Sequence, residues 1–221
     1  MARVSSRNRA VSVYYNGQTA NSLYQLADRV GRAVSRFGEA ELRARAGLKR
    51  RMLPAARREI RKHFNVRNSL LVDSMRVQEH NTRKGDALAI WASARRISLI
   101  EFGGRWRGPA RKRNGKGFAA PATAMVVKQG RQQYQGAFIA TIRGRRAIRV
   151  RTYSGEGKRV HRGPVRMLYG PSPLYMMRPT DHHSLVSRSA GDVRKTVVGE
   201  MQDFYVSELH RLYQLQVGGR R

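Results

Sequence analysis

The loop at residues 105–117 holds the side chains of this sequence that are best suited to binding chemistry. Six cations and one tryptophan occur within its thirteen residues: Arg105, Trp106, Arg107, Arg111, Lys112, Arg113 and Lys116. Guanidinium and ammonium groups bind phosphate oxygens, and an indole ring offers a face on which a base stacks. We therefore expect this loop to contact a nucleic-acid backbone or an acidic protein surface. No base-reading motif accompanies it, so sequence-specific recognition is not predicted.

Basic side chains at two further places are expected to bind the same partner. They are Arg143, Arg145, Arg146, Lys158 and Arg159. The first three surround Gly144 between two apolar runs, a pattern that predicts a hairpin turn. The other two lie in a glycine-rich stretch at residues 154–163. That stretch has neither the Walker A spacing nor a GxGxxG pattern opening a helix, so we do not expect a phosphate cradle of those types.

Patterns that would indicate catalysis or metal binding are weak. Asp181, His182 and His183 form a candidate metal cluster, but adjacent side chains point in different directions and no further ligand follows at a suitable spacing. We interpret this triplet as the loop before a helix, with Asp181 or Ser184 as the N-cap. Carboxylates for acid–base or metal chemistry are nearly missing from the middle of the chain. The sequence therefore predicts no enzyme, no cofactor and no small-molecule substrate.

Charge is the dominant property of the composition. The formal net charge is +31, and residues 102–180 contain eighteen Lys and Arg residues but one carboxylate, Glu156. Residues 181–221, by contrast, contain six basic and five acidic side chains. A field of this strength repels itself and favours an acidic partner at close range. We therefore expect either contact with nucleic acid or a place in an assembly that has acidic surfaces.

Length and hydrophobicity predict one folded domain with a core. The chain has 221 residues, of which 40% are hydrophobic and none is cysteine. The missing cysteine excludes disulfides and thiolate metal sites and fits a cytosolic protein. We expect no membrane span, because no apolar run reaches about 18 residues. Residues 1–7 lack the apolar segment of a secretory signal.

The spacing of hydrophobic residues along the chain predicts the helices and strands that position the basic side chains. Residues 1–18 lack a period and are predicted to be a flexible arm, and residues 19–221 to be a single α+β domain. Within it, residues 20–74 are helical, 75–175 are rich in strands, and 184–217 form a C-terminal helix. Pro54 should kink the first helix or begin a second one over residues 54–64, since proline removes a helical hydrogen bond. Residues 68–72 are expected to form a short third helix.

Short runs of β-branched and aromatic residues mark the strands. They cover residues 75–78, 87–93, 97–102, 138–142 and 148–153. Residues 137–142 should pair with 147–152 as a hairpin, and alternation at 148–151 places Arg149 on the face opposite Ile148. The predicted fold is therefore a small twisted antiparallel sheet packed by a kinked N-terminal helix and a long C-terminal helix, with basic loops.

The order of four short motifs resembles a known family. NVRNSL at residues 65–70 precedes RISLIEFGGR at 96–105, and GAFIA at 136–140 precedes GPVRMLYGPS at 163–172. This succession resembles the tail completion proteins of long-tailed bacteriophages, the minor tail protein Z family, over residues 20–215. The chain departs from the family pattern in having Gly-Pro-Val-Arg-Met-Leu where Pro-Ile and a short spacer are usual. Its middle loops are also longer and more basic.

The resemblance implies a structural virion protein without catalysis. Such a protein assembles as a homo-oligomeric ring, with six copies favoured, in the neck between the tail and the DNA-filled head. Its implied partners are the tail terminator or tail tube, the head connector, and packaged DNA in a channel lined by Arg and Lys. The implied location is the virion, after assembly in the host bacterial cytoplasm.

Two alternatives remain open from the sequence. Composition alone favours a stand-alone nucleic-acid-binding protein without sequence preference. The long, nearly neutral C-terminal helix is better suited to subunit packing than to phosphates, which favours the neck protein. A nuclease is the third interpretation, and the scarcity of carboxylates opposes it.

Overall fold

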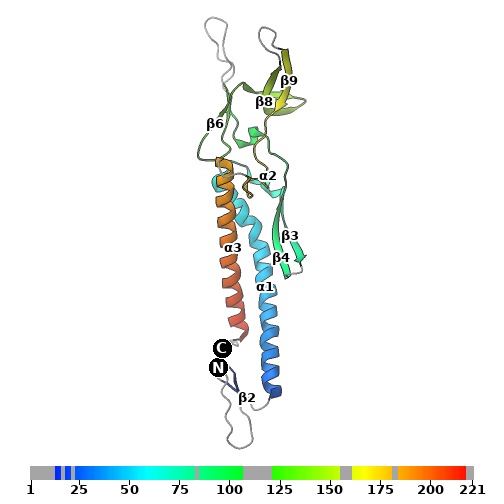
Figure 1. Cartoon of the computed structure of the whole chain (residues 1–221), viewed down its shortest axis with the longest axis vertical. Coiled ribbons are helices and arrows are strands. Elements are labelled where there is room, and N and C mark those ends of the chain that lie inside the picture. Colours follow the sequence, from blue (N-terminus) through cyan, green and yellow to red (C-terminus); the bar gives the residue numbers. More distant parts are fainter. Residues whose placement is uncertain are drawn as a thin grey trace, which may run out of the picture. The chain divides into compact units, whose positions relative to one another are not determined.

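The protein is a mixed helix and sheet structure, which confirms the α+β class (Figure 1). The computed structural model describes residues 13–15, 18–20, 23–82, 85–106, 121–154, 161–180 and 184–217. The chain divides into two compact units. One unit comprises Met1–Leu48 and Met201–Arg221, and the other comprises Lys49–Glu200. Both boundaries fall inside long helices, α1 (Leu23–His63) and α3 (Leu185–Val217).

The smaller unit contains the first part of α1, the last part of α3 and a short hairpin. Strands β1 (Val13–Tyr15) and β2 (Gln18–Ala20) pair antiparallel, so the structure places strand residues inside the arm predicted over residues 1–18. The other residues of that arm lie outside the described residues. Ala40 and Ala44 of α1 are fully buried, whereas Phe37 is 46% exposed. Phe37 packs edge-to-face on Tyr213, with ring centroids 6.0 Å apart.

Helix α1 runs without a break through Pro54, so the prediction of a second helix beginning there is wrong. Pro54 lies on the exposed face of α1, as does Arg50, whose carbonyl loses its partner. That carbonyl can bond to water, which reduces the cost of the missing hydrogen bond. On its buried side Ala56 and Ile60 are fully buried. The packing of this buried side outweighs the tendency of proline to interrupt a helix.

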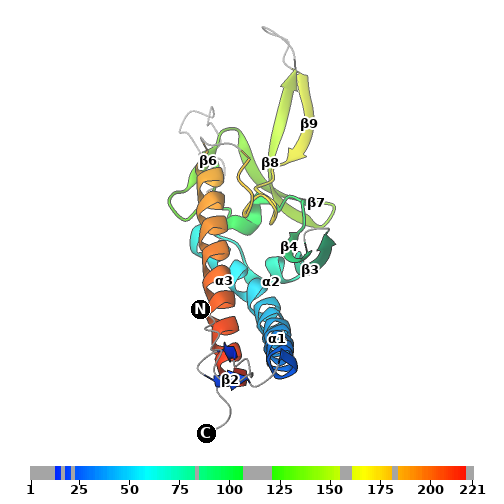
Figure 2. The same cartoon turned by 60° about the horizontal axis from the view of Figure 1, so that its bottom comes forward.

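The strands of the larger unit form three small antiparallel sheets, which with β1–β2 makes four in the described chain. After the short helix α2 (Asn68–Val72), β3 (Met75–Thr82) pairs with β4 (Gly85–Ala92). Strand β5 (Ala122–Ala124) pairs with β6 (Gln132–Tyr134). Strands β7 (Ala137–Ile142), β8 (Arg145–Ser154) and β9 (His161–Met167) form the third sheet, of which β8 and β9 are seen in Figure 2. The predicted sheet is thus divided into smaller ones.

The predicted hairpin between residues 137–142 and 147–152 is confirmed, with a tighter turn than expected. Ile142 pairs with Arg145, so Arg143 and Gly144 alone form the loop. Both have positive φ, 51° and 71°, as a two-residue turn matching the twist of the strands requires. Arg145 and Arg146 therefore belong to β8.

Residues 97–102, expected to be a strand, are extended only at their start. Ser98 forms an isolated bridge with Tyr169, and a 3-10 helix, η1 (Leu99–Phe102), follows. Leu99 and Phe102 are both buried. The three-residue period of a 3-10 turn places these two side chains on one side, where a strand would separate them.

The C-terminal helix is confirmed as α3, and Ser184 is its cap. The Ser184 hydroxyl accepts a hydrogen bond from the Ser187 backbone N–H at 3.1 Å. Within the larger unit, Val193 and Val197, which lie four residues apart on one side of α3, are buried. Arg149 is buried although it is charged, and its neighbour in β8, Ile148, is fully buried, so both faces of the strand are covered here. Its guanidinium donates to the carbonyls of Arg145 (3.2 Å) and Ala140 (3.5 Å), which are the acceptors that make this burial tolerable.

Candidate nucleic-acid interface

The candidate interface is built where the chain leaves η1 and runs along β5. Gly103 ends η1 in the left-handed conformation, with φ of 67°, which turns the backbone toward β5. Arg105 and Thr123 then exchange two backbone hydrogen bonds of 2.8 Å. This bridge fixes the direction of the segment that carries Arg105 and Trp106.

Gly104 lets this segment approach the hairpin closely. A Cβ atom at Gly104 would lie 2.9 Å from Ile148 Cδ1 and 3.0 Å from Ile100 Cα. A Cβ atom there would require Ile148 and η1 to shift, so the close approach of this segment is favoured by glycine. Gly104 therefore lies directly against Ile148, which belongs to the core of the larger unit.

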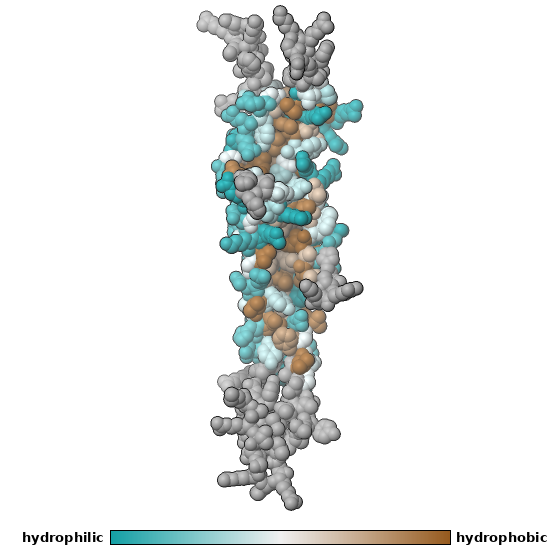
Figure 3. Space-filling view, viewed as in Figure 1, coloured by the Kyte–Doolittle hydropathy of each residue, from teal (hydrophilic) through white to brown (hydrophobic). Residues whose placement is uncertain are grey.

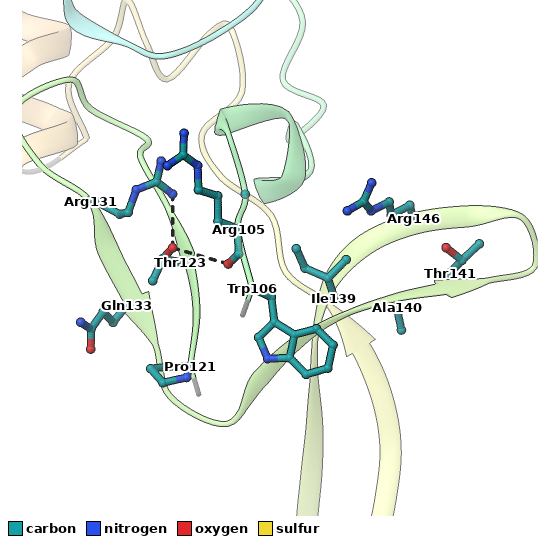
Figure 4. A pocket seen from close by; sticks show the side chains of 11 residues that line it. Arg105, Trp106, Pro121, Thr123, Arg131, Gln133, Ile139, Ala140, Thr141 and Arg146 are labelled. Atoms are coloured by element: carbon teal, nitrogen blue, oxygen red, sulfur yellow. Dashed lines mark hydrogen bonds between the residues drawn. The ribbon is translucent and has the colours of Figure 1, made fainter. Parts of the chain in front are cut away.

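The groove has a volume of about 890 Å³ and lies between the β5–β6 pair and the β7–β8 hairpin (Figure 4). Its lining contains three arginines and one tryptophan among polar and small apolar side chains. The lining residues are Gly104, Arg105, Trp106, Pro121, Thr123, Arg131, Gln133, Ile139, Ala140, Thr141 and Arg146. No carboxylate, histidine or cysteine occurs among these described lining residues.

The three arginines of the groove differ in how they are held. Arg131 Nη1 donates to the Gly103 carbonyl at 3.0 Å and to Thr123 Oγ1 at 3.2 Å, so its position is fixed. The Arg105 and Arg131 side chains extend in the same direction in Figure 4, away from the Trp106 ring. Arg105 and Arg146 are exposed, and within the described residues their guanidinium groups form no hydrogen bond or ion pair. Those donors are available to an anion.

Trp106 supplies the apolar part of the groove. Its ring lies on the side of Ile139 in Figure 4, and its centroid is 6.4 Å from that of Phe138 in a tilted arrangement. Aromatic pairs at this separation are attractive. The contact holds the half-buried indole against the hairpin.

The lining of the groove is suited to binding anions. Arginine donors recognise phosphate oxygens, and a lining without Asp, Glu, His or Cys provides no general base and no thiolate nucleophile. The arrangement therefore suits a phosphodiester backbone with one stacked base.

The structure brings together only part of the predicted site. Arg105, Trp106 and Arg146 line the groove. Arg143 and Arg145 are exposed at the hairpin turn and do not line it. The other predicted residues lie outside the described residues: Arg107, Arg111, Lys112, Arg113, Lys116, Lys158 and Arg159.

Sequence reasoning missed Arg131, the best-anchored cation of the groove. It stands alone between Gly130 and Gln132 and belongs to no basic run. The available signal was its position directly before a short polar strand. That signal does not indicate that β6 folds back beside Arg105, because the pairing depends on residues ten positions earlier.

No described helix is both long and apolar enough to cross a membrane. Among the described residues no group of three acidic or histidine side chains could hold a metal ion, and the Asp181–His183 triplet lies outside them. Comparison of the chain with protein-family models, curated proteins and solved structures finds no match.

Proposed function

We propose that this chain is a non-enzymatic structural protein of a tailed-phage neck, in which the groove contacts the phosphates of packaged DNA. The observation that carries the DNA contact is a groove with three arginines, one tryptophan and no carboxylate among its lining residues. The placement in the neck rests on the ordered motifs that resemble the tail completion family.

Binding in the groove is independent of base sequence. Arg105 and Arg146 contact phosphate oxygens, and Arg131 stiffens the wall between them. Phosphate contacts fix position and orientation without carrying sequence information. A protein that holds the leading end of a genome needs this property, because the DNA it meets is set by packaging and not by a recognition site.

Large apolar side chains on the surface support assembly into a homo-oligomer. In the smaller unit Val34, Leu42, Val206 and Leu215 are each more than 60% exposed. Figure 3 shows apolar residues reaching the surface among hydrophilic ones. Exposed apolar side chains that gather on a surface mark protein contacts. A six-fold ring, joined to the tail terminator and the head connector in the virion, is the assembly we propose.

The DNA contact is tested by removing two groove charges and two matched control charges. Arg105→Ala with Arg146→Ala removes exposed groove cations, and Arg143→Ala with Arg145→Ala removes the same charge at the turn. Affinity for a labelled duplex is measured by fluorescence anisotropy across a salt series. We expect the slope of log K against log salt to fall by about 1.8 for the groove pair, at about 0.9 per phosphate contact. Equal losses in both variants would refute binding in the groove.

The neck role is tested separately by electron microscopy of particles made without this protein. Filled heads and finished tails should accumulate apart and join when the protein is added back. Joined particles in its absence would contradict the role.

A stand-alone, sequence-independent nucleic-acid binder is the second candidate. The net charge of +31 favours it, because such a field binds polyanions without any assembly. The two candidates differ in the particle experiment, since a stand-alone binder leaves head–tail joining unchanged. They agree on the behaviour of the groove variants.

A further inference from the structure

We propose that three adjoining hollows of the larger unit form one continuous basic track, which binds a run of consecutive backbone phosphates from the end of α1 to the groove. This inference rests on the DNA contact proposed above and extends it to residues that no sequence pattern singled out. Arg61 and Lys128 are the decisive additions.

The first hollow lies beside the last turns of α1 and has a volume of about 470 Å³. Most of its lining residues are basic. They are Pro54, Arg57, Arg58, Arg61, Lys62, Asn68 and Lys128. Lys128 comes from the turn between β5 and β6, and its backbone N–H donates to the His63 carbonyl at 2.9 Å. This bond holds the lysine next to the basic face of the helix.

The second hollow, of about 390 Å³, begins where the first ends. It is lined by Arg61, Asn65, Val66, Arg67, Ile100, Glu101 and Gly103. Arg61 lines both hollows, so the two hollows adjoin at this residue.

The second hollow continues into the groove across a single peptide unit. Gly103 lines the second hollow, and its neighbour Gly104 lines the groove. Arg131, which lines the groove, donates to the Gly103 carbonyl at 3.0 Å. The first two hollows thus share Arg61, and the second hollow and the groove are lined by the neighbouring residues Gly103 and Gly104.

Positive charge along the track exceeds what the carboxylates near it neutralise. Glu200 pairs with Arg58 at 2.6 Å, Glu59 with Lys62 at 2.6 Å, and Glu101 with Arg67. Each of these carboxylates pairs with a cation, and Glu59 also lies 3.4 Å from His63 Nε2. Four others form no side-chain hydrogen bond or ion pair within the described residues: Arg61, Lys128, Arg105 and Arg146.

The basic cluster at the end of α1 works against the stability of the helix. Arg57 and Arg61, like Arg58 and Lys62, stand four residues apart, where like charges repel. Cations in the last turn do favour the helix dipole, but Arg57 and Arg58 lie before that turn. Arg58 and Lys62 have carboxylate partners, but Arg57 and Arg61 form no ion pair within the described residues, and an external anion would offset their repulsion.

The shape of the site selects a polymer over a single anion. Three linked hollows present cations one after another, and a nucleic-acid strand carries one phosphate about every 3.4 Å along its axis. A free phosphate would occupy one hollow and leave the others charged. The ligand class is therefore a phosphodiester chain spanning the end of α1 and the groove.

The test compares three double variants of the full chain. Arg61→Ala with Lys128→Ala alters the new part of the track, and Arg105→Ala with Arg146→Ala alters the groove. Arg194→Ala with Lys195→Ala removes the same charge from exposed positions of α3. Duplex binding is measured over a salt series, and poly-glutamate binding is measured in parallel.

We expect the Arg61 and Lys128 pair to lower the salt slope by about 1.8, and the combination with the groove pair to lower it by about 3.6. The α3 pair should keep the slope of the unaltered protein. Melting temperature at low salt should stay equal or rise in the Arg61 and Lys128 variant, since a repulsion is removed. If that variant fails to fold, R61Q with K128Q replaces it, because glutamine keeps most of each side-chain stem.

The track is overturned if the Arg61 and Lys128 pair behaves like the α3 pair while the groove pair still lowers the slope. In that case the proposed function survives without the track. The track would also be overturned if the Arg61 and Lys128 variant lost poly-glutamate binding and kept its duplex binding. An acidic protein would then be the partner at these two residues. A groove pair without effect would remove the proposed DNA contact itself.

Discussion

Substitution of Gly104 by alanine tests the packing that shapes the groove. A Cβ atom there would lie 2.9 Å from Ile148 Cδ1, 3.0 Å from Ile100 Cα and 3.1 Å from Ile100 Cδ1. One of the three atoms belongs to the backbone of η1, and Ile148 is fully buried, so the obstruction cannot move aside freely. Overpacking of this kind destabilises a protein by about 1–3 kcal/mol.

Gly130→Ala is the matched control for this substitution. No atom lies within 4 Å of the Cβ it would add, and the residue has no positive φ. Alanine at a compatible position restricts the unfolded chain and stabilises by about 0.4–1 kcal/mol. The two substitutions therefore shift stability in opposite directions although the chemical change is identical.

Urea unfolding followed by circular dichroism measures the difference. With a slope of about 2 kcal/mol per molar urea, Gly104→Ala should lower the midpoint by about 0.5–1.5 M, and Gly130→Ala should raise it slightly. Duplex affinity should fall in Gly104→Ala alone, because Arg105 and Trp106 follow the displaced backbone. Equal midpoints for the two variants would refute the argument that glycine is required for this close approach.

Two further substitutions test local features of the fold. Ser184→Ala removes the hydroxyl that accepts from the Ser187 N–H at 3.1 Å, and it should destabilise the protein by about 1 kcal/mol in urea unfolding, whereas Ser184→Asp should retain stability. Burial raises the pKa of Tyr134 above its ordinary value, so its contribution to stability is complete below about pH 10 and is lost at higher pH. The urea midpoint should therefore fall less between pH 8 and pH 10.5 in Tyr134→Phe than in the unaltered protein. An equal fall in the two proteins would contradict a raised pKa of Tyr134.

Elements with a strong local signal were predictable from the sequence. The period of three and four over residues 184–217 predicted α3, and the buried Val193 and Val197 confirm its stripe. The glycine between basic residues predicted the turn at Gly144, because a two-residue hairpin needs positive φ. In these cases local preference and tertiary packing agree.

Elements decided by tertiary packing were not predictable. Pro54 indicates a helix boundary locally, but the apolar face that follows it is buried and keeps α1 continuous. Residues 97–102 have the composition of a strand, and only the burial of Leu99 and Phe102 on one side favours a 3-10 turn. A pattern of residue types cannot show which of these surfaces the rest of the chain will cover.

The candidate site was predictable in its charge and only partly in its geometry. Arg105, Trp106 and Arg146 come together from two predicted segments, whereas Arg61 and Lys128 were not predicted to belong to the site. Their proximity depends on the bond between the Lys128 N–H and the His63 carbonyl, across more than sixty residues of chain. Contacts of that separation leave no trace in local spacing.

The arginines with structural roles explain why the central charge remains uncompensated. Arg131 donates to the Gly103 carbonyl and Arg149 to the Arg145 carbonyl, so both use neutral backbone acceptors. Within the described part of residues 102–180 no arginine forms an ion pair. A carbonyl satisfies the hydrogen bonds of a guanidinium but leaves its charge in place, so even arginines that stabilise the fold add to the external field. Charge that the fold leaves without carboxylate partners supports the proposed contact with an anionic partner outside the chain.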